Sequence, residues 1–203
     1  MISTYSELQT TIANYLGRTD LTAQIVDFIS LAENRMSRDL RTRDMLKYSE
    51  ATMTPSGDRL SLPNDFLELR DLHVDTDPVT PMQYLSPSVF FKQGRTKQEG
   101  VPTRYTILAS DFKLAPIPDE AYTAIMLYYA KPNPLSSLNP TNVFLSKYPD
   151  AILYASLSEA EPYLMNDARI QTWAALYDRA IENIQTSDDK GEYSGVPLAI
   201  TLA

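Results

Sequence analysis

The feature that most constrains this chain is a double change in the spacing of its apolar residues. Before about residue 44, and again after about residue 148, apolar side chains recur every three to four positions, which is typical of helices with one buried face. Between about residues 46 and 131 the spacing shortens toward two and turn residues multiply, which indicates strands. We therefore predict an α+β protein in which a β segment interrupts a helical one.

The N-terminal segment predicts two helices. Thr4 and Glu7 have the spacing of a capping box, and Gly17 suits the left-handed end of the first helix. Asp20 or Thr22 is expected to cap the second helix. Its apolar stripe comprises Ile25, Phe28, Ile29, Ala32, Met36 and Leu40. Its far end is basic, with Arg35, Arg38, Arg41 and Arg43.

The middle segment predicts an antiparallel sheet or sandwich. Residues 48–53 and the strand carrying Leu60 and Leu62 are expected to form a hairpin around the turn at 55–58. Further strands are expected at 66–74, 105–108, 112–114 and 122–130, with a short helix at 86–93.

The helical spacing that returns near Pro149 continues to Ile184, with an interruption at Pro162. Neither terminal helix pair can bury its apolar stripe alone, so we expect the two pairs to form a four-helix bundle. The predicted parts are 1–44 and 135–186 for the bundle, 45–134 for the β insertion, and 187–203 for an extended C-terminal arm.

The search for catalytic chemistry yields little. The chain has no cysteine and one histidine, His73, which falls within a predicted strand. Carboxylate pairs at Asp75 and Asp77 and at Asp119 and Glu120 lie beside prolines, where turns are the simpler interpretation. We predict no catalytic residues, no cofactor and no metal. The net charge of −8 disfavours specific DNA binding. The chain shows no signal-peptide or membrane-span pattern, so we expect a soluble protein made in the cytoplasm.

Two features suggest interaction surfaces. The arginines at 35, 38, 41 and 43 could bind an acidic partner, or could equally satisfy the helix dipole and nearby acids. The C-terminus ends in an uncharged apolar stretch, which would be an aggregation hazard unless covered by its own domain or by a partner. The partner interpretation is slightly favoured. The residues expected to bind there are Tyr193, Val196, Leu198, Ile200 and Leu202.

A resemblance to a known family rests on several motifs in a fixed order. They are IANYLGR at 12–18, FISLAE at 28–33, LSLPNDFLEL at 60–69, GVPTRYTI at 100–107, LAPIP at 114–118, LYYA at 127–130 and YPDAILYA at 148–155, followed by Trp173 and Tyr177. Together they resemble the head-to-tail adaptors of tailed bacteriophages of the SU10 type. The similarity extends from about residue 5 to 185, and the tail after 187 is not matched.

The resemblance implies a structural virion protein in the phage neck. It implies a homo-oligomeric ring, expected to be a dodecamer, that lies under the portal protein, contacts tail or nozzle proteins, and lets DNA pass without specific binding. It implies no cofactor and no catalytic residue. Three alternatives remain open: a more distal neck or tail-completion protein, a carboxylate-dependent peptidoglycan hydrolase, and a cytoplasmic binding module unrelated to phages.

Overall fold

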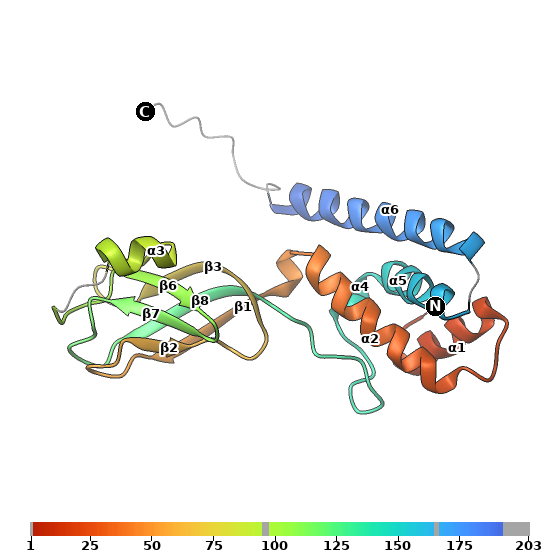
Figure 1. Cartoon of the computed structure of the whole chain (residues 1–203), viewed down its shortest axis with the longest axis horizontal. Coiled ribbons are helices and arrows are strands. Elements are labelled where there is room, and N and C mark those ends of the chain that lie inside the picture. The colour runs from red at the N-terminus through yellow and green to blue at the C-terminus, as the bar shows by residue number, and fades with distance from the viewer. Residues whose placement is uncertain (1, 95–97, 165–166, 193–203) are drawn as a thin grey trace. The chain divides into compact units, whose positions relative to one another are not determined.

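The chain divides into two compact units. The computed structural model describes residues 2–94, 98–164 and 167–192. A helical unit comprises Met1–Met45 and Pro132–Ala203, and a β unit comprises Leu46–Lys131 (Figure 1). The helical unit contains α1 (Tyr5–Leu16), α2 (Thr22–Asp39), η1 (Arg43–Met45), α4 (Val143–Lys147), α5 (Pro149–Leu164) and α6 (Asp167–Glu192). The β unit contains β1 (Leu46–Thr52), β2 (Arg59–Ser61), β3 (Phe66–Val74), β4 (Thr80–Pro81), β5 (Gln83–Tyr84), α3 (Pro87–Val89), η2 (Phe90–Gly94), β6 (Arg104–Leu108), β7 (Asp111–Ala115) and β8 (Thr123–Ala130). The α+β class is confirmed.

The ends of α1 are those that its sequence predicts. The Thr4 hydroxyl accepts a hydrogen bond from the Glu7 amide at 3.3 Å, and the Glu7 carboxylate accepts one from the Thr4 amide at 3.2 Å. Gly17 ends the helix with φ of 64°, a conformation that costs glycine little. The predicted cap of α2 is wrong, because Leu21 precedes that helix and contributes no side-chain bond. Asp20 instead pairs with Arg18 at 2.6 Å.

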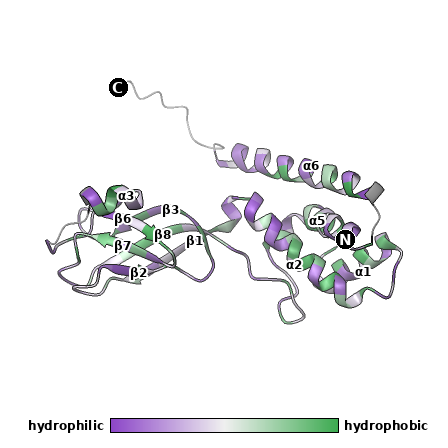
Figure 2. Ribbon diagram, in the orientation of Figure 1, coloured by the Kyte–Doolittle hydropathy of each residue, from purple (hydrophilic) through white to green (hydrophobic). Residues whose placement is uncertain are grey.

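Helix α5 lies at the centre of the helical unit and contacts α1, α2, α4 and α6. Almost every residue from Ala151 to Glu161 is buried, so this central stretch of the helix has no solvent face, while Tyr163 near its end is exposed. A helix that is buried on all sides needs amphipathic neighbours to cover it. Figure 2 shows the mixture of hydrophobic and hydrophilic residues on α2 and α6 that such covering helices require. The short helix α4, capped by the Asn142 side chain at 3.1 Å, was not anticipated.

The β unit consists of two four-stranded sheets, with orders β1-β8-β3-β4 and β2-β7-β6-β5. The predicted hairpin is wrong, because β1 pairs with β8 while β2 pairs with β7 in the other sheet. The sheets are also not wholly antiparallel, since β5 and β6 run parallel. Strand β3 has the predicted bounds, and β6, β7 and β8 lie where strands were expected.

The two sheets of the β unit share one apolar core. Side chains from both sheets meet there, among them Leu72 and Met126 from the first sheet and Phe112 and Leu114 from the second. The Phe66 ring contacts the Phe112 ring edge to face, with centroids 6.0 Å apart. Burial between the sheets, rather than the local turn at 55–58, therefore decides which strands pair.

The first six residues of the predicted C-terminal arm are helical. Residues 187–192 are the last turns of α6 instead of the start of an extended segment. The reason is tertiary: the Asp188 carboxylate accepts hydrogen bonds at 3.2 Å from the Arg43 amide and from Arg43 Nε, which anchors these turns. The remaining arm residues, 193–203, lie outside the described residues. Among the described helices, none is long and apolar enough to cross a membrane.

Candidate interaction surface

Two of the predicted arginines, Arg35 and Arg38, lie in the C-terminal half of α2, and the other two follow the helix. The Arg35 side chain is largely enclosed. Its guanidinium lies 3.8 Å from the Asp39 carboxylate on α2, 3.7 Å from Glu159 on α5 and 3.9 Å from Asp178 on α6. It also stacks over the Tyr177 ring, 4.3 Å from the centroid. A planar guanidinium suits such a site because it can pair with several carboxylates and stack at the same time. Arg35 therefore joins three helices of its own unit.

Tyr177 reinforces this junction between α2 and α6. Its hydroxyl donates a hydrogen bond of 2.7 Å to the Asp39 carboxylate. Burial, followed by this hydrogen bond, raises the pKa of Tyr177, so the phenol stays protonated over the physiological range. The Gln185 amide adds a hydrogen bond of 3.2 Å to the Asp39 carbonyl. The two helices are thus held together by polar contacts along their length.

Arg41 and Arg43 follow the C-terminal end of α2 and bind groups near it. Arg41 donates to the carbonyls of Ser37 at 2.8 Å and Leu40 at 2.6 Å, which satisfies acceptors that a helix C-terminus leaves free. Arg43 pairs with Asp188 at 3.2 Å and packs so closely on α6 that a side chain at Gly191 would collide with its guanidinium. Both contacts match the helix-end interpretation of these arginines.

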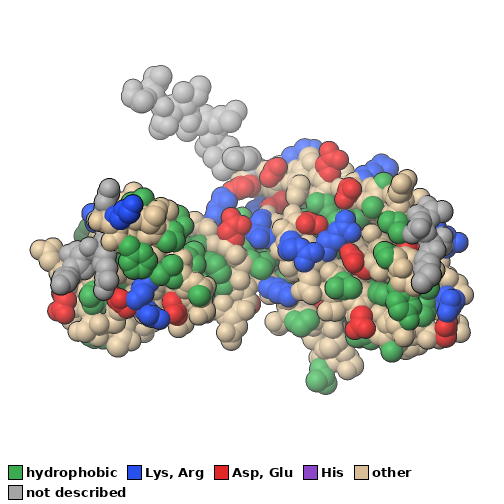
Figure 3. Space-filling model, viewed as in Figure 1, with side chains coloured by type: hydrophobic (Ala, Val, Ile, Leu, Met, Phe, Trp, Pro, Cys, Tyr) green, Lys and Arg blue, Asp and Glu red, His purple; other side chains and the backbone are tan. Residues whose placement is uncertain are grey.

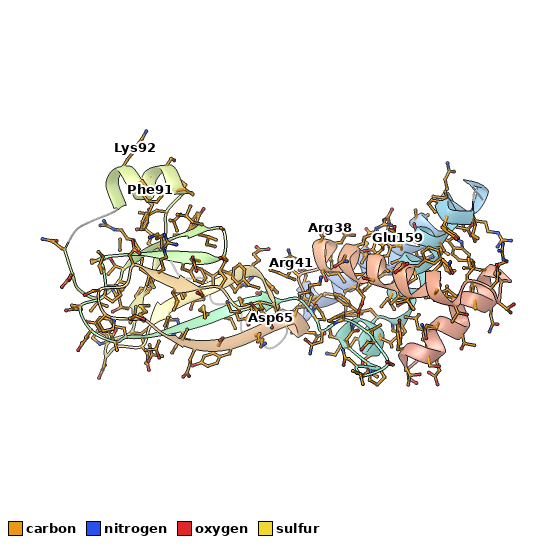
Figure 4. The ribbon with its side chains drawn as sticks, turned by 60° about the horizontal axis from the view of Figure 1, so that its bottom comes forward. Arg38, Arg41, Asp65, Phe91, Lys92 and Glu159 are labelled. Carbon is orange, nitrogen blue, oxygen red and sulfur yellow. The ribbon has the colours of Figure 1, made fainter. Side chains whose placement is uncertain are left out.

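Arg38 differs from the other three. It is exposed, and among the described residues it has no hydrogen-bond or ion-pair partner. Figure 4 shows Arg38 and Arg41 at the same end of α2. Figure 3 shows Lys and Arg side chains together with Asp and Glu side chains on the visible face of the helical unit. Among the described residues, Arg38 is therefore the one predicted arginine whose guanidinium makes no hydrogen bond or ion pair within the protein and can bind a partner. The predicted tail residues Tyr193, Val196, Leu198, Ile200 and Leu202 lie outside the described part of the chain.

A second exposed feature, the loop between β8 and α4, was missed by sequence reasoning. Leu138 at its tip is 97% exposed. The loop is nevertheless well held: the Ser136 amide donates to the Asn139 carbonyl at 2.9 Å, and the Asn139 side chain donates to the Pro134 carbonyl at 2.9 Å. The only signal in the sequence is a pair of leucines, Leu135 and Leu138, in a stretch rich in Pro, Ser and Asn.

The base of this loop is fixed by Glu33, a carboxylate of α2 that is only 5% exposed. It accepts hydrogen bonds from the Leu135 amide at 3.0 Å and from the Asn142 side chain at 2.6 Å. Beside the loop is a cavity of ≈ 650 Å³ whose lining carries no charged side chain and includes Tyr5, Val26 and Leu135. Burial, followed by the charges of Glu33 and Asp27, raises the pKa of Tyr5. The helical unit thus presents an exposed leucine side chain, on a hydrogen-bonded loop, next to a cavity without charged lining residues.

The β unit has an exposed apolar cluster of its own. Phe91 is 49% exposed on the turn that follows α3, next to the buried Phe90. Figure 4 shows Phe91 and Lys92 on the short helix that rises above the sheets. Tyr84 and Val89 nearby in sequence are also exposed. Exposed aromatic side chains on ordered elements are typical of protein-protein contacts.

The residues considered for catalysis have ordinary local contacts. His73 is in β3, as expected, with Nδ1 2.9 Å from the Asp71 carboxylate. Asp75 and Asp77 are exposed beside Pro78. Asp119 accepts a hydrogen bond of 2.8 Å from Tyr122, which raises the pKa of that phenol. Within the described ranges, no group of three or more His, Asp or Glu side chains is placed to hold a metal ion.

Exposed apolar side chains lie in both units, at Leu138 in the helical unit and at Tyr84, Val89 and Phe91 in the β unit, as is typical of protein-protein contact surfaces. The family model described as SU10 adaptor protein matches residues 3–200, nearly the whole chain. The protein belongs to this family, a family of phage adaptor structural proteins, and the resemblance seen in the sequence is confirmed. A comparison with curated proteins gives no match.

Proposed function

We propose that this protein is a head-to-tail adaptor that assembles as a ring under the portal of a tailed phage and connects the capsid vertex to the tail. The observation that carries the proposal is the match to the adaptor family over residues 3–200, which spans both units. In this role the protein is a component of the virion, it contacts portal and tail proteins, and DNA passes through the ring. The proposed ring is a dodecamer.

The contacts within the helical unit support a rigid body for such a ring. We propose that α1, α2, α5 and α6 act as a four-helix bundle. In support, α5 packs on the other three, and the Tyr15 ring of α1 meets the Trp173 ring of α6 with centroids 5.9 Å apart. The Arg35 ion pairs across α2, α5 and α6 resist sliding between these helices. A subunit that carries load between capsid and tail needs this stiffness.

Arg38 is the described residue that we propose as a portal contact. Its guanidinium is exposed, while Arg35, Arg41 and Arg43 are committed to contacts within the unit. In the proposed interface the Arg38 guanidinium donates two hydrogen bonds to one carboxylate of the portal. The apolar tail residues, from Val196 to Leu202, are proposed as a further partner contact.

The test mixes the purified chain with the portal ring of the same phage and weighs the product by mass photometry. The expected product is a discrete complex that carries many copies of the chain. Replacing Arg38→Glu is expected to weaken binding about tenfold, ~1.4 kcal/mol, because it sets like charges against each other. Arg179→Glu on α6 is the matched control, an exposed arginine without a partner among the described residues.

The outcomes of this mixture separate the candidate functions. A portal ring that binds no copies overturns the proposal and favours a more distal neck protein. Equal weakening by Arg38→Glu and Arg179→Glu removes the specific role of Arg38 and leaves only a general charge effect. Cell-wall hydrolysis by the purified chain, abolished by Asp or Glu substitutions in the β unit, would instead establish the enzymatic alternative.

A further inference from the structure

Strand β1 is a long free edge of the first sheet. It pairs with β8 along all seven of its residues, and within the described part of the chain it has no other backbone partner. Alternate residues of an edge strand turn their N–H and C=O groups away from the sheet. Such a row of unpaired groups is a template for another strand.

The other sheet edges are protected. Strand β4 has two residues, one of which is Pro81, and β2 and β5 have three and two residues. Short strands and proline are the usual means by which proteins blunt an edge. Strand β1 contains no proline, and its register with β8 runs without a bulge, whereas β3 has two register shifts against β8. The long edge therefore lacks the proline and short length that close the other edges, and its one inward-facing charge is Lys47 at its beginning.

The side of β1 that faces the core carries no bulky apolar side chain. Lys47, Ser49 and Ala51 stand opposite Tyr128, Met126 and Ala124 of β8, whose side chains are buried in the core. Ser49 and Ala51 are small and only partly buried, so the core is thinly covered along this edge. A further strand beside β1, with apolar residues on the same side, would complete the cover of the core.

The chain itself contains a segment that suits this edge. Residues 193–203 follow α6 and carry no charged side chain. Leu198, Ile200 and Leu202 alternate with Ala199 and Thr201, the period-two pattern of a strand with one apolar face. Pro197 stands at the start of the alternation, where proline is tolerated. Fully extended, these residues span roughly 35–40 Å, which is enough to leave their own helical unit.

We propose that the C-terminal segment, residues 196–203, of one copy adds as a strand to the free edge of β1 in a neighbouring copy. The inference rests on the ring assembly proposed above and identifies what the apolar tail binds. Leu198, Ile200 and Leu202 then lie on the core side of β1, while backbone hydrogen bonds fill its outer edge. The exchange ties adjacent subunits together and covers a segment that would otherwise be an aggregation hazard.

Cysteine cross-linking tests this arrangement directly, because the chain has no cysteine of its own. Tyr48→Cys or Glu50→Cys in β1 is mixed with Ala199→Cys or Thr201→Cys in the tail, each on a separate full-length chain. After oxidation with the portal ring present, and again in concentrated free chain, a mixed disulfide is expected in at least one of the four combinations. Its yield should exceed by about tenfold that of Arg179→Cys, the exposed control, since adjacent strands bring Cβ atoms to about 4.5–5.5 Å.

A second set of variants distinguishes strand addition from side-chain docking. In the cross-linking background with Thr201→Cys, Ala199→Pro and Ile200→Pro each remove one backbone donor, and one of these two neighbouring donors must face β1. That proline variant should abolish the mixed disulfide, whereas Ile200→Val keeps the donor and should preserve it. Yields for both proline variants equal to that of Ile200→Val would overturn strand addition. Mass photometry of the same mixtures reports portal binding independently.

The two readouts separate the inference from the proposed function. If the portal complex forms but no combination exceeds the control, the inference is overturned and the adaptor role stands. A disulfide that forms only when both cysteines are on one chain overturns the exchange between copies. A mixed disulfide without portal binding supports the exchange and counts against the adaptor role. If neither the mixed disulfide nor the portal complex forms, both the strand exchange and the adaptor role are overturned.

Discussion

The helical unit and the β unit are held together by different means. In the β unit, backbone ladders join distant strands and an apolar core lies between the sheets. In the helical unit, most backbone bonds stay within single helices, so side chains must largely specify how the helices meet. Buried or half-buried polar groups do this work, above all Glu33, Arg35 and the pair of Asp39 and Tyr177. Polar substitutions should thus damage the helices most, and apolar truncations the sheets.

The largest effect is expected from the β core. Phe112 is fully buried and contacts the rings of Phe66 and Tyr105. Phe112→Ala should destabilise the β unit by about 3–5 kcal/mol, because it removes apolar contacts and leaves a cavity. Hydrogen exchange followed by mass spectrometry should show faster exchange in β1 to β8. Phe91→Ala, at a half-exposed phenylalanine, is the control and should change stability by at most about 0.5 kcal/mol. Similar losses for both would contradict the assignment of the core.

Glu33→Ala should give the next largest effect, and in the helical unit. It leaves the Leu135 amide and the Asn142 side chain without their acceptor, which costs about 2–3 kcal/mol. The fluorescence of Trp173, the one tryptophan of the chain, follows urea unfolding of this unit. Glu33→Gln retains one acceptor oxygen and should recover part of the loss. No difference between Ala and Gln would show that the hydrogen bonds do not stabilise the loop.

Arg35→Met should destabilise the helical unit by about 1 kcal/mol. Methionine keeps most of the apolar stem but loses the ion pairs with Glu159 and Asp178 and the stacking on Tyr177. Urea unfolding followed by Trp173 fluorescence measures the change. Arg38→Met, at an exposed arginine of the same helix, is the matched control and should be nearly neutral. A larger loss at Arg38 would reverse the roles assigned to the two arginines.

The smallest effect is a pH dependence in the β unit. Burial would raise the pKa of Asp65, but hydrogen bonds from Lys47 at 2.6 Å and Tyr128 at 2.9 Å outweigh it and hold the pKa below the usual 3.8. A lowered folded pKa stabilises the protein above about pH 3.8, and this contribution is lost as the pH falls through the folded pKa. Asp65→Asn should flatten the acid dependence by at most about 1 kcal/mol, measured by hydrogen exchange between pH 5 and 2.

The corresponding control lies in the other unit. Partial burial would raise the pKa of Asp44, yet hydrogen bonds from Lys147 and Tyr148 hold the pKa below 3.8. Asp44→Asn should therefore flatten the acid dependence of the helical unit and leave that of the β unit unchanged. If either substitution altered both units equally, their acid responses would not be separable.

Much of the local structure could be predicted from the sequence. The capping box of α1, the glycine at its end and the bounds of β3 follow from residue types and spacing, because they depend on neighbours within a few positions. The family could also be recognised, since its motifs keep their order along nearly the whole chain.

The candidate surface was predicted only in part. Arg38 was one of four arginines with similar spacing, and nothing local distinguishes it from Arg35. Arg35 meets Glu159 and Asp178, which lie more than a hundred positions away in the chain. Leu138 was missed because its exposure depends on how Glu33 holds the loop.

By itself, the sequence determined the type and order of the elements, since apolar period and capping are local properties. Only the tertiary structure decided that β1 and β2 belong to different sheets, that the middle of α5 is buried on all sides, and that α6 continues to Glu192. These outcomes depend on which distant surfaces are buried together. Burial free energy and hydrogen bonds between remote residues, such as Arg43 and Asp188, are set by the whole fold and override local preference.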